Sequence, residues 1–258
     1  MAPRIAIIGG TGVYNPGILS NVQEMIVENA YGKAKVAQGT YQGHEIIFLA
    51  RHGATHSLPP HLINYRANIW ALKELGVKRV LATAAVGSLN ETMAPGSFVL
   101  VDQFLDFTKN RVSTFFDGGD QGVTHTDMTH PYCPQLREIL AQEAKSLIVK
   151  VHQGGTYVTT EGPRFETPAE IRMFKMLGGD LVGMTSVPEV VLAREAGLCY
   201  ATIGMVTNFA AGISTTELSH QEVLDVMEEN SANLSKLLMK TVEKIPEERT
   251  CKCDHTSK

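Results

Sequence analysis

The chain has 258 residues, of which 43% are hydrophobic and 19% charged, and its formal net charge is −4. This balance suits a soluble globular protein with a substantial core and provides no basic field for nucleic acid. No apolar run reaches the roughly 18 residues that span a bilayer, and the start MAPRIAIIGGTG does not resemble a signal peptide, so we expect a cytoplasmic protein.

In chain order, short β-rich runs alternate with helical periodicities, which predicts an α/β fold. Thr167 and Glu170 form a capping-box pattern at one helix start, and Ser219 opens a second. The expected strands are Arg4–Ile8, Glu45–Ala50, Val80–Ala84, Phe98–Val101, Thr156–Thr160, Val182–Met184 and Tyr200–Val206. The expected helices are Leu62–Leu75, Pro134–Leu147, a segment from Thr167, Glu189–Ala196 and a long segment from Ser219 towards Ile245.

The sequence contains no internal repeat, low-complexity segment or Pro/Ser-rich linker. We therefore predict a single domain over residues 1–245, followed by a mobile tail over residues 246–258. The tail carries Cys251, Cys253 and His255, which could bind a metal or form a strained or intermolecular disulfide. Cys133 and Cys199 lie in apolar or proline-rich surroundings and are expected to be buried thiols.

Several predicted strands end in residues that bind anions. A Gly-rich turn with Thr11 follows the first strand and can approach an anion through backbone N–H groups. Arg51 and His52 follow the second strand and provide donors that suit phosphate. Because ligands bind outside the carboxyl ends of strands in open α/β sheets, an anion site is the functional interpretation. An ordinary exposed loop arginine is the alternative.

Four further strand ends complete the candidate site. Ala84-Ala85 would let backbone amides face a ligand, and Met184-Thr185 adds a hydroxyl, although small residues and methionine also serve as packing. The stretch Glu161–Glu166 places an aromatic ring and two carboxylates beside a Gly-Pro turn. Asn208 places an amide at the last strand end, where a structural asparagine is the alternative.

Other reaction classes find less support in the sequence. There is no G-x-S-x-G motif around a serine nucleophile, and the nine histidines show no helical pair with a third ligand, so we expect no catalytic metal. The Gly-rich turn has Asn15 where a dinucleotide fingerprint needs its third glycine, which argues against an oxidoreductase. A non-catalytic nucleotide-binding module would need the turn but not the remaining polar set.

Taken together, the motifs resemble the purine nucleoside and methylthioadenosine phosphorylases from about Arg4 to Ile245. The segments that carry this resemblance are IIGGTGVY, FLARHG, INYRANIWALKELG, TAAVGSLN, GSFVLVDQFLDFT, TEGPRFET, GMTSVPEVVLAREAG and CYATIGMVTNFAAG. The resemblance implies a single α/β domain with a central mixed sheet flanked by helices. It also implies a trimer or a dimer of trimers that needs inorganic phosphate as co-substrate and no cofactor.

The resemblance also implies roles for individual residues. Phosphate binding falls on Thr11, Arg51, His52, Ala84, Ala85 and Thr185. Contacts to the nucleoside fall on Phe165, Glu166, Met184, Asn208, Phe209, Ala210 and His220, and on His125 from a neighbouring subunit. Of these, Asn208, Glu166 and His52 are expected to act in catalysis.

Two departures within the family bear on the substrate. Methylthioadenosine enzymes carry serine and aspartate at the positions of Glu166 and Asn208, whereas this chain resembles the branch that acts on inosine and guanosine. The carboxylate of Glu166 can accept from N1–H of a 6-oxopurine, and Asn208 can donate towards O6. His220 matches the histidine that binds the ribose 5′-hydroxyl in that branch. The alternative to a purine salvage enzyme is a phosphorylase that acts on 5′-methylthioinosine or 5′-methylthioadenosine.

Overall fold

The computed structural model describes residues 4–9, 16–53, 57–119, 122–214 and 219–254, without the side chains of Pro16 and His220. The helices are α1 (Tyr65–Glu74), α2 (Pro134–Ala144), α3 (Pro168–Met176), α4 (Ser186–Glu195) and α5 (His220–Lys244), with short 3-10 turns at Pro16–Ile18 and Pro60–Leu62. The strands are β1 (Ile5–Gly9), β2 (Ser20–Asn29), β3 (Gly32–Tyr41), β4 (His44–Ala50), β5 (Arg79–Ser88), β6 (Phe98–Leu100), β7 (Gln103–Phe107), β8 (Val151–His152), β9 (Thr156–Thr160), β10 (Leu181–Gly183) and β11 (Cys199–Phe209).

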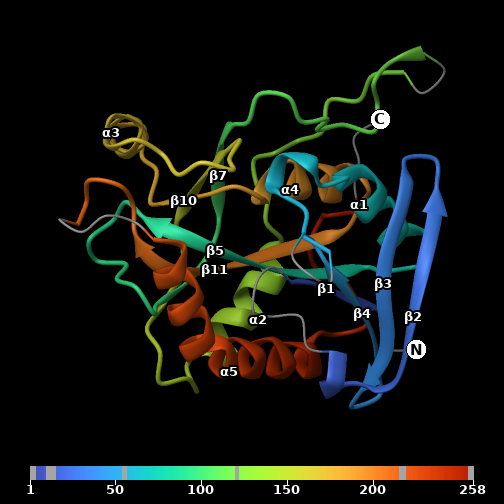
Figure 1. Ribbon diagram of the computed structural model, residues 1–258. Helices are drawn as coiled ribbons and strands as arrows, with labels where there is room; N and C mark the ends of the chain where they lie inside the picture. The colour runs from blue at the N-terminus through green and yellow to red at the C-terminus, as the bar shows by residue number, and fades with distance from the viewer. Residues whose placement is uncertain (1–3, 10–15, 54–56, 120–121, 215–218, 255–258) are drawn as a thin grey trace.

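The described strands form one mixed sheet (Figure 1). At its centre β1 lies parallel to β4 on one side and to β5 on the other, and β11 runs parallel to β5 along its whole length. Antiparallel pairs occur where β10 meets β5, where β6 meets β11, and in the β2–β3–β4 meander. The predicted single α/β domain with a central mixed sheet flanked by helices is confirmed.

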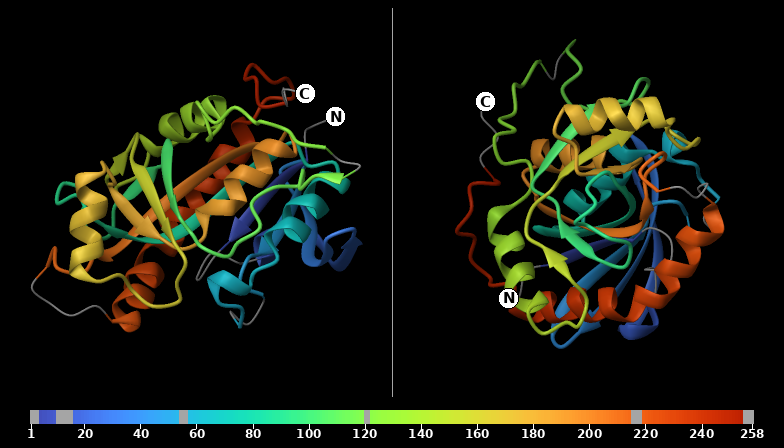
Figure 2. Two further views of the ribbon diagram at one scale, coloured as in Figure 1. Left: turned by 90° about the horizontal axis from the view of Figure 1, so that it is seen from above. Right: turned by 90° about the vertical axis from the view of Figure 1, so that its left-hand side faces the viewer.

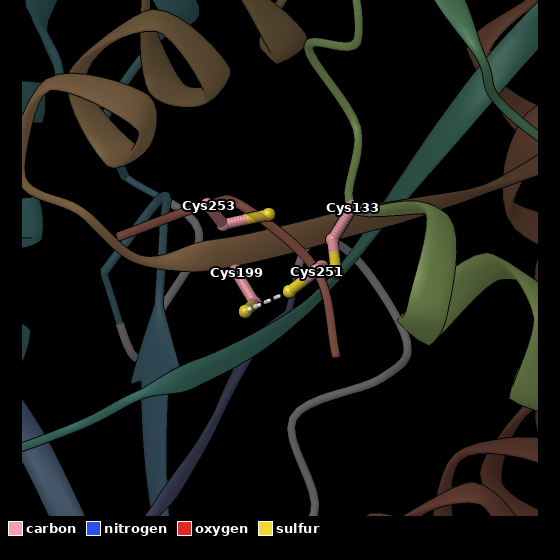
Figure 3. A group of neighbouring side chains, drawn as sticks. All are labelled: Cys133, Cys199, Cys251 and Cys253. Carbon is pink, nitrogen blue, oxygen red and sulfur yellow. Dashed lines mark hydrogen bonds between the residues drawn. The ribbon is translucent and has the colours of Figure 1, made fainter. Parts of the chain in front are cut away.

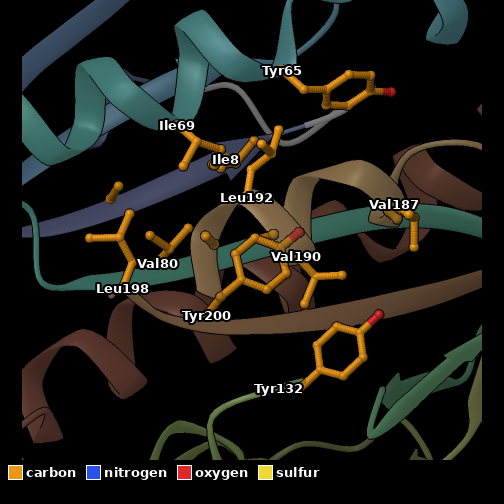
Figure 4. Close-up of a cluster of buried hydrophobic side chains, with 14 of the residues drawn as sticks. Ile8, Tyr65, Ile69, Val80, Tyr132, Val187, Val190, Leu192, Leu198 and Tyr200 are labelled. Atoms are coloured by element: carbon orange, nitrogen blue, oxygen red, sulfur yellow. The ribbon is translucent and has the colours of Figure 1, made fainter. Parts of the chain in front are cut away.

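Helices cover both faces of the sheet (Figures 1 and 2). On one face α1 and α4 pack against each other, and a core cluster that includes Ile8, Ile69 and Tyr200 fills the space beneath them (Figure 4). On the other face α2 and α5 enclose a second cluster. Burial of this apolar area on both faces of the central strands provides the main driving force for the fold.

Several boundaries differ from the sequence prediction for local reasons. The helix expected from Leu62 begins at Tyr65, because Asn64 caps it by accepting a hydrogen bond from the amide of Ala67. The expected capping box of Thr167 and Glu170 is confirmed at the start of α3. The hairpin of β2 and β3 and the strand β7 were not predicted.

The C-terminal segment was expected to be mobile from residue 246, yet its described part, which ends at Asp254, contacts the domain. Arg249 donates to the carbonyl oxygens of Gly197 and Lys78, and the amide of Thr250 donates to the side chain of Gln135. Cys253 is only 2% exposed. These contacts attach residues 249–253 to the domain. None of the helices within the described ranges has the length and apolar character that a membrane span requires.

Candidate active site

The carboxyl ends of the central strands surround one cavity. Arg51 follows β4, Ala84 lies in the last part of β5, Met184 follows β10, and Asn208 lies at the end of β11. The cavity opens to solvent, and its empty volume is about 840 Å³ when the space at its mouth is included. The residues that line it are Arg51, His52, Pro60, Ala84, Ala85, Val86, Gly87, Phe165, Glu166, Val182, Gly183, Met184, Thr185, Thr207, Asn208, Ala210 and Val223.

Arg51 lies at this cavity in a bidentate ion pair with Glu189 of α4. Its Nε and Nη2 atoms donate to the two carboxylate oxygens at 2.7 Å each, and Nη1 donates to the carbonyl oxygen of Thr83 at 2.9 Å. Burial alone would lower the pKa of Arg51, but the charge of Glu189 outweighs it and holds the pKa above its usual value. A guanidinium has five N–H donors, and two of those of Arg51 have no partner among the described residues, so they can bind a ligand.

His52 is oriented by the loop that follows it. Its Nδ1 atom lies 2.8 Å from the carbonyl oxygen of Leu58. Because a carbonyl only accepts, Nδ1 carries the proton there, and in the neutral ring Nε2 has the one lone pair that can accept. In the neutral ring Nε2 can accept a proton from a ligand, and in the charged ring it can donate one.

Small residues in β5 leave room for the site. Ala84 and Ala85 line the cavity with nothing larger than a methyl group. At Gly87 an added Cβ would lie 3.3 Å from both the Nδ2 atom of Asn208 and a methyl group of Val182. A larger side chain would therefore displace Asn208.

The carboxylate of Glu166 enters the cavity from the segment between β9 and α3. Its Oε1 atom accepts a hydrogen bond of 2.6 Å from the hydroxyl of Thr160, the last residue of β9. Burial raises the pKa of Glu166 above its usual value, and the hydrogen bond from Thr160 partly opposes that rise. The neighbouring ring of Phe165 is 41% exposed and can stack on a flat ligand.

A β-bulge in β11 orients the side chain of Asn208. The pairing with β5 shifts between Val206 and Asn208, so that Thr207 is the extra residue. The hydroxyl of Thr207 donates to Oδ1 of Asn208 at 2.8 Å, and Nδ2 donates to the carbonyl oxygen of Phe209 at 2.9 Å. The second N–H of this amide has no partner within the part of the chain that the structure describes, so the side chain can donate to a ligand.

The structure brings most of the predicted site residues together. Those at the cavity are Arg51, His52, Ala84, Ala85, Phe165, Glu166, Met184, Thr185, Asn208 and Ala210. The side chain of Phe209 is not among the lining residues, and His125 lies exposed in the segment between β7 and α2. Thr11 lies outside the described residues, as does the side chain of His220.

The sequence matches the model of the Phosphorylase superfamily over residues 4–243. The chain belongs to this superfamily. It is 63% identical to the "Probable 6-oxopurine nucleoside phosphorylase" of Moorella thermoacetica over 97% of this chain and 96% of that protein. It is 50% identical to the S-methyl-5′-thioadenosine phosphorylase of Pyrococcus furiosus over 97% and 96% of the two chains. A solved methylthioadenosine phosphorylase from Schistosoma mansoni, in complex with adenine, superposes with a TM-score of 0.89 at 37% identity over 93% and 91%.

Two residues that organise the site of this phosphorylase were not predicted. Glu189 is 1% exposed and also accepts a hydrogen bond of 2.6 Å from the hydroxyl of Tyr200, which fixes the carboxylate that holds Arg51. Because α4 is buried at nearly every position, Glu189 lies among apolar neighbours, and no pattern in the sequence marks it as the partner of Arg51.

Arg111 is the second residue that organises the site and was not predicted. Its guanidinium donates to the carbonyl oxygens of Thr160, Glu161, Met184 and Val187, and it lies over the ring of Tyr65 with 5.5 Å to the centroid. These contacts fasten the segment that carries Glu166 to the one that carries Met184 and Thr185. Because every hydrogen-bond partner is a backbone carbonyl or a distant hydroxyl, the sequence provides no motif for it.

Proposed function

We propose that this phosphorylase cleaves 6-oxopurine nucleosides, inosine and guanosine, with inorganic phosphate to give the free base and ribose 1-phosphate. The observation that carries the proposal is the pairing of an acceptor, Glu166, with a donor, Asn208, in one cavity. The 63% identity to a relative named for 6-oxopurine nucleosides supports it, because the relative named for methylthioadenosine is more distant.

The hydrogen-bonding edge of the base explains the preference. A 6-oxopurine presents N1–H as a donor and O6 as an acceptor. Glu166 accepts from N1–H, and the free N–H of Asn208 donates to O6 and N7. Adenine reverses this edge, so its N1 lone pair faces the carboxylate and its 6-amino group faces the Asn208 donor. Each mismatched buried group costs on the order of 1–3 kcal/mol, and such a site discriminates strongly.

Phosphate is the nucleophile in the proposed reaction and attacks C1′ of the nucleoside. Arg51, His52, Thr11, Thr185 and the backbone near Ala84-Ala85 bind it. The C1′–N9 bond breaks with its electron pair moving to the base, and the positive charge that develops on the ribose is stabilised by the phosphate dianion. Asn208 stabilises the departing base through N7 and O6, and Glu166 holds the opposite edge. No cofactor takes part.

The remaining contacts position the substrate. Phe165 stacks on the base, Met184 lies under the ribose, and Ala210 and the backbone of Phe209 line the base pocket. His220 binds the 5′-hydroxyl, and His125 reaches the same end of the sugar from a neighbouring subunit. Exposed apolar side chains at the end of α3, Met176 and Leu177, support an assembly of several copies, either a trimer or a dimer of trimers. We further propose a role in purine salvage within the cytoplasm.

One observation favours a second candidate, 5′-methylthioinosine. Val223, near the start of α5, lines the cavity with an apolar side chain that suits a methylthio group. This substrate keeps the 6-oxopurine edge, so it agrees with Glu166 and Asn208 and differs only at the 5′ position.

The test is release of hypoxanthine from inosine by the purified chain. We expect release that requires inorganic phosphate and that arsenate supports in its place, while 5′-methylthioinosine is cleaved more slowly. Release that proceeds equally without phosphate or arsenate would identify a hydrolase and contradict the proposal. Light scattering after size exclusion gives the number of copies, and a monomer would contradict the proposed assembly.

A further inference from the structure

The four cysteines of the chain meet in one place outside the candidate active site (Figure 3). Cys133 is the residue before α2, Cys199 is the first residue of β11, and Cys251 and Cys253 come from the C-terminal segment. Their sulfur atoms all lie within 4.8 Å of one another, and the pair Cys199 and Cys251 is 3.3 Å apart. All four are free thiols.

This arrangement has the donor set and dimensions of a tetrahedral metal site. In a Cys₄ zinc site each Zn–S bond is about 2.3 Å long, so the sulfur atoms lie roughly 3.8 Å apart. Sulfur pairs at up to 4.8 Å reach that spacing by approaching one another by about 1 Å or less, and the Cys199–Cys251 pair at 3.3 Å reaches it by separating about 0.5 Å. Cys133, Cys199 and Cys253 are buried, which keeps competing water away from them.

Arg79 provides an independent sign of negative charge at this cluster. Its side chain is fully buried, Nη1 donates to the Cys199 sulfur at 3.2 Å, and Nη2 donates to the carbonyl oxygen of Glu248 at 3.0 Å. Its Nε atom has no hydrogen-bond partner among the described residues. A buried cation without an opposite charge is unfavourable. Four thiolates around a divalent ion carry a net charge of −2, which would supply the missing charge.

The C-terminal segment is held so that its cysteines reach the cluster. Arg249 donates to the carbonyl oxygens of Gly197 and Lys78, which flank β11 and β5, and Thr250 is bonded to Gln135 of α2. These contacts do not involve sulfur. The ligands are therefore brought together by the fold before any ion binds, which favours binding because less chain has to be ordered.

We propose that Cys133, Cys199, Cys251 and Cys253 form a structural site for one thiophilic divalent cation, with zinc as the best match. Each thiol releases its proton to solvent as its sulfur binds the ion, and no electron is transferred. The ion joins the C-terminal segment to β11 and α2. Arg79 opens β5, whereas the cavity begins near Ala84, roughly 17 Å along the strand, so the ion stabilises the fold and does not touch the substrate.

The experiment uses the full chain, purified without oxygen. Elemental mass spectrometry measures the metal content of the purified chain. In a second measurement, Co²⁺ is added to the reduced, metal-free chain as a spectroscopic probe. We expect about one zinc per chain and the intense thiolate charge-transfer and visible bands of tetrahedral cobalt. In the double variant Cys251→Ser/Cys253→Ser the metal content should fall at least about tenfold. Lys252→Ser changes the same segment, keeps all four thiols, and should bind metal as the wild type does.

Two outcomes would overturn the proposal. An unreduced, denatured chain lighter by four hydrogen atoms, without metal, would show that the cysteines form two disulfides instead. Four titratable thiols that take up neither zinc nor Co²⁺ would show a plain thiol cluster. The cobalt measurement needs no variant, so it decides the matter even if the double variant does not fold. No substrate is involved, and the outcome is independent of the proposed reaction.

Discussion

The guanidinium of Arg51 and the carboxylate of Glu189 form a two-bond ion pair in which both side chains are almost fully buried. The pair joins the end of β4 to α4 across the cavity wall, and the hydroxyl of Tyr200 fixes the carboxylate from the far side. Because Glu189 compensates the charge of Arg51, the guanidinium can stay at the cavity without a bound anion, with two N–H groups that no described residue uses. A dianion such as phosphate would then bind to an arginine that is already positioned.

The first prediction concerns this pair. Glu189→Gln leaves the Arg51 charge buried without a counter-charge and should lower the free energy of unfolding by about 3 kcal/mol, measured by urea denaturation. Saturating phosphate should restore more stability to the variant than to the wild type, because the dianion replaces the lost charge. Glu45→Gln breaks the half-exposed Arg4–Glu45 pair and is the control, with an expected loss below about 1 kcal/mol. Equal losses in the two variants would contradict the role given to Glu189.

The second prediction concerns pH. Burial raises the pKa of Glu166. Its ionised form is the stronger acceptor for N1–H of a 6-oxopurine, whereas its protonated form gains an O–H donor that suits the N1 lone pair of adenine. The ratio of kcat/KM for inosine to kcat/KM for adenosine should therefore be high at neutral pH and fall as pH drops through the raised pKa. The ratio is the useful quantity, since ionisation of phosphate affects both substrates alike. A ratio that does not change with pH would show that Glu166 does not discriminate between the two bases.

A matched pair of variants sharpens that measurement. Thr160→Val removes the hydroxyl that stabilises the charged carboxylate, so the pKa of Glu166 should rise further and the fall in the ratio should move to higher pH. Thr159→Val removes the neighbouring hydroxyl, which has no hydrogen-bond partner among the described residues, and should leave the profile in place. The same shift in both variants would point to a general change in β9 instead.

The third prediction exchanges the two groups that contact the base edge. The double variant Asn208→Asp/Glu166→Ser should lower the inosine-to-adenosine ratio of kcat/KM by about a hundredfold or more, equivalent to roughly 3 kcal/mol. Both substrates are assayed with the same phosphate concentration, so changes in phosphate binding cancel. If the ratio stays at the wild-type value, specificity depends on other residues.

The fourth prediction separates the two candidate sugars. His220→Ala should reduce kcat/KM for inosine about tenfold or more, the cost of one hydrogen bond to the 5′-hydroxyl, while 5′-methylthioinosine loses little. Val223→Ser tests the converse, because a hydroxyl in the apolar wall should disfavour the methylthio group. Equal losses for both substrates in His220→Ala would remove its assigned role.

The sequence predicts the central strands well because they are buried on both faces and appear as continuous apolar runs, as in Arg4–Ile8 and Tyr200–Val206. The hairpin of β2 and β3 escapes prediction because the side chains of β2 are mostly exposed and polar, so no apolar alternation marks the strand. The end of β11 was also predicted too early, because the strand continues through a bulge at Thr207 to Phe209.

Some residues of the candidate site could likewise be predicted from the sequence, and others could not. Its residues could be predicted where they follow strands, as Arg51 and Met184 do. Parallel pairing brings the carboxyl end of β4 to the site, whereas Met184 reaches it because β10 runs antiparallel along the last part of β5. Glu189 and Arg111 could not be predicted, since their roles come from contacts between segments far apart in the chain. The meeting of Cys133 and Cys199 with the C-terminal cysteines has the same cause and likewise leaves no local pattern.

The most direct measurement of the central claim is a competition assay in one reaction mixture. Inosine, adenosine and 5′-methylthioadenosine are supplied at equal concentration with phosphate, and the released bases are separated and quantified as hypoxanthine and adenine. The account predicts that hypoxanthine forms first and in large excess, because Glu166 and Asn208 match only the 6-oxopurine edge. Adenine released as fast as hypoxanthine, or faster, would contradict it.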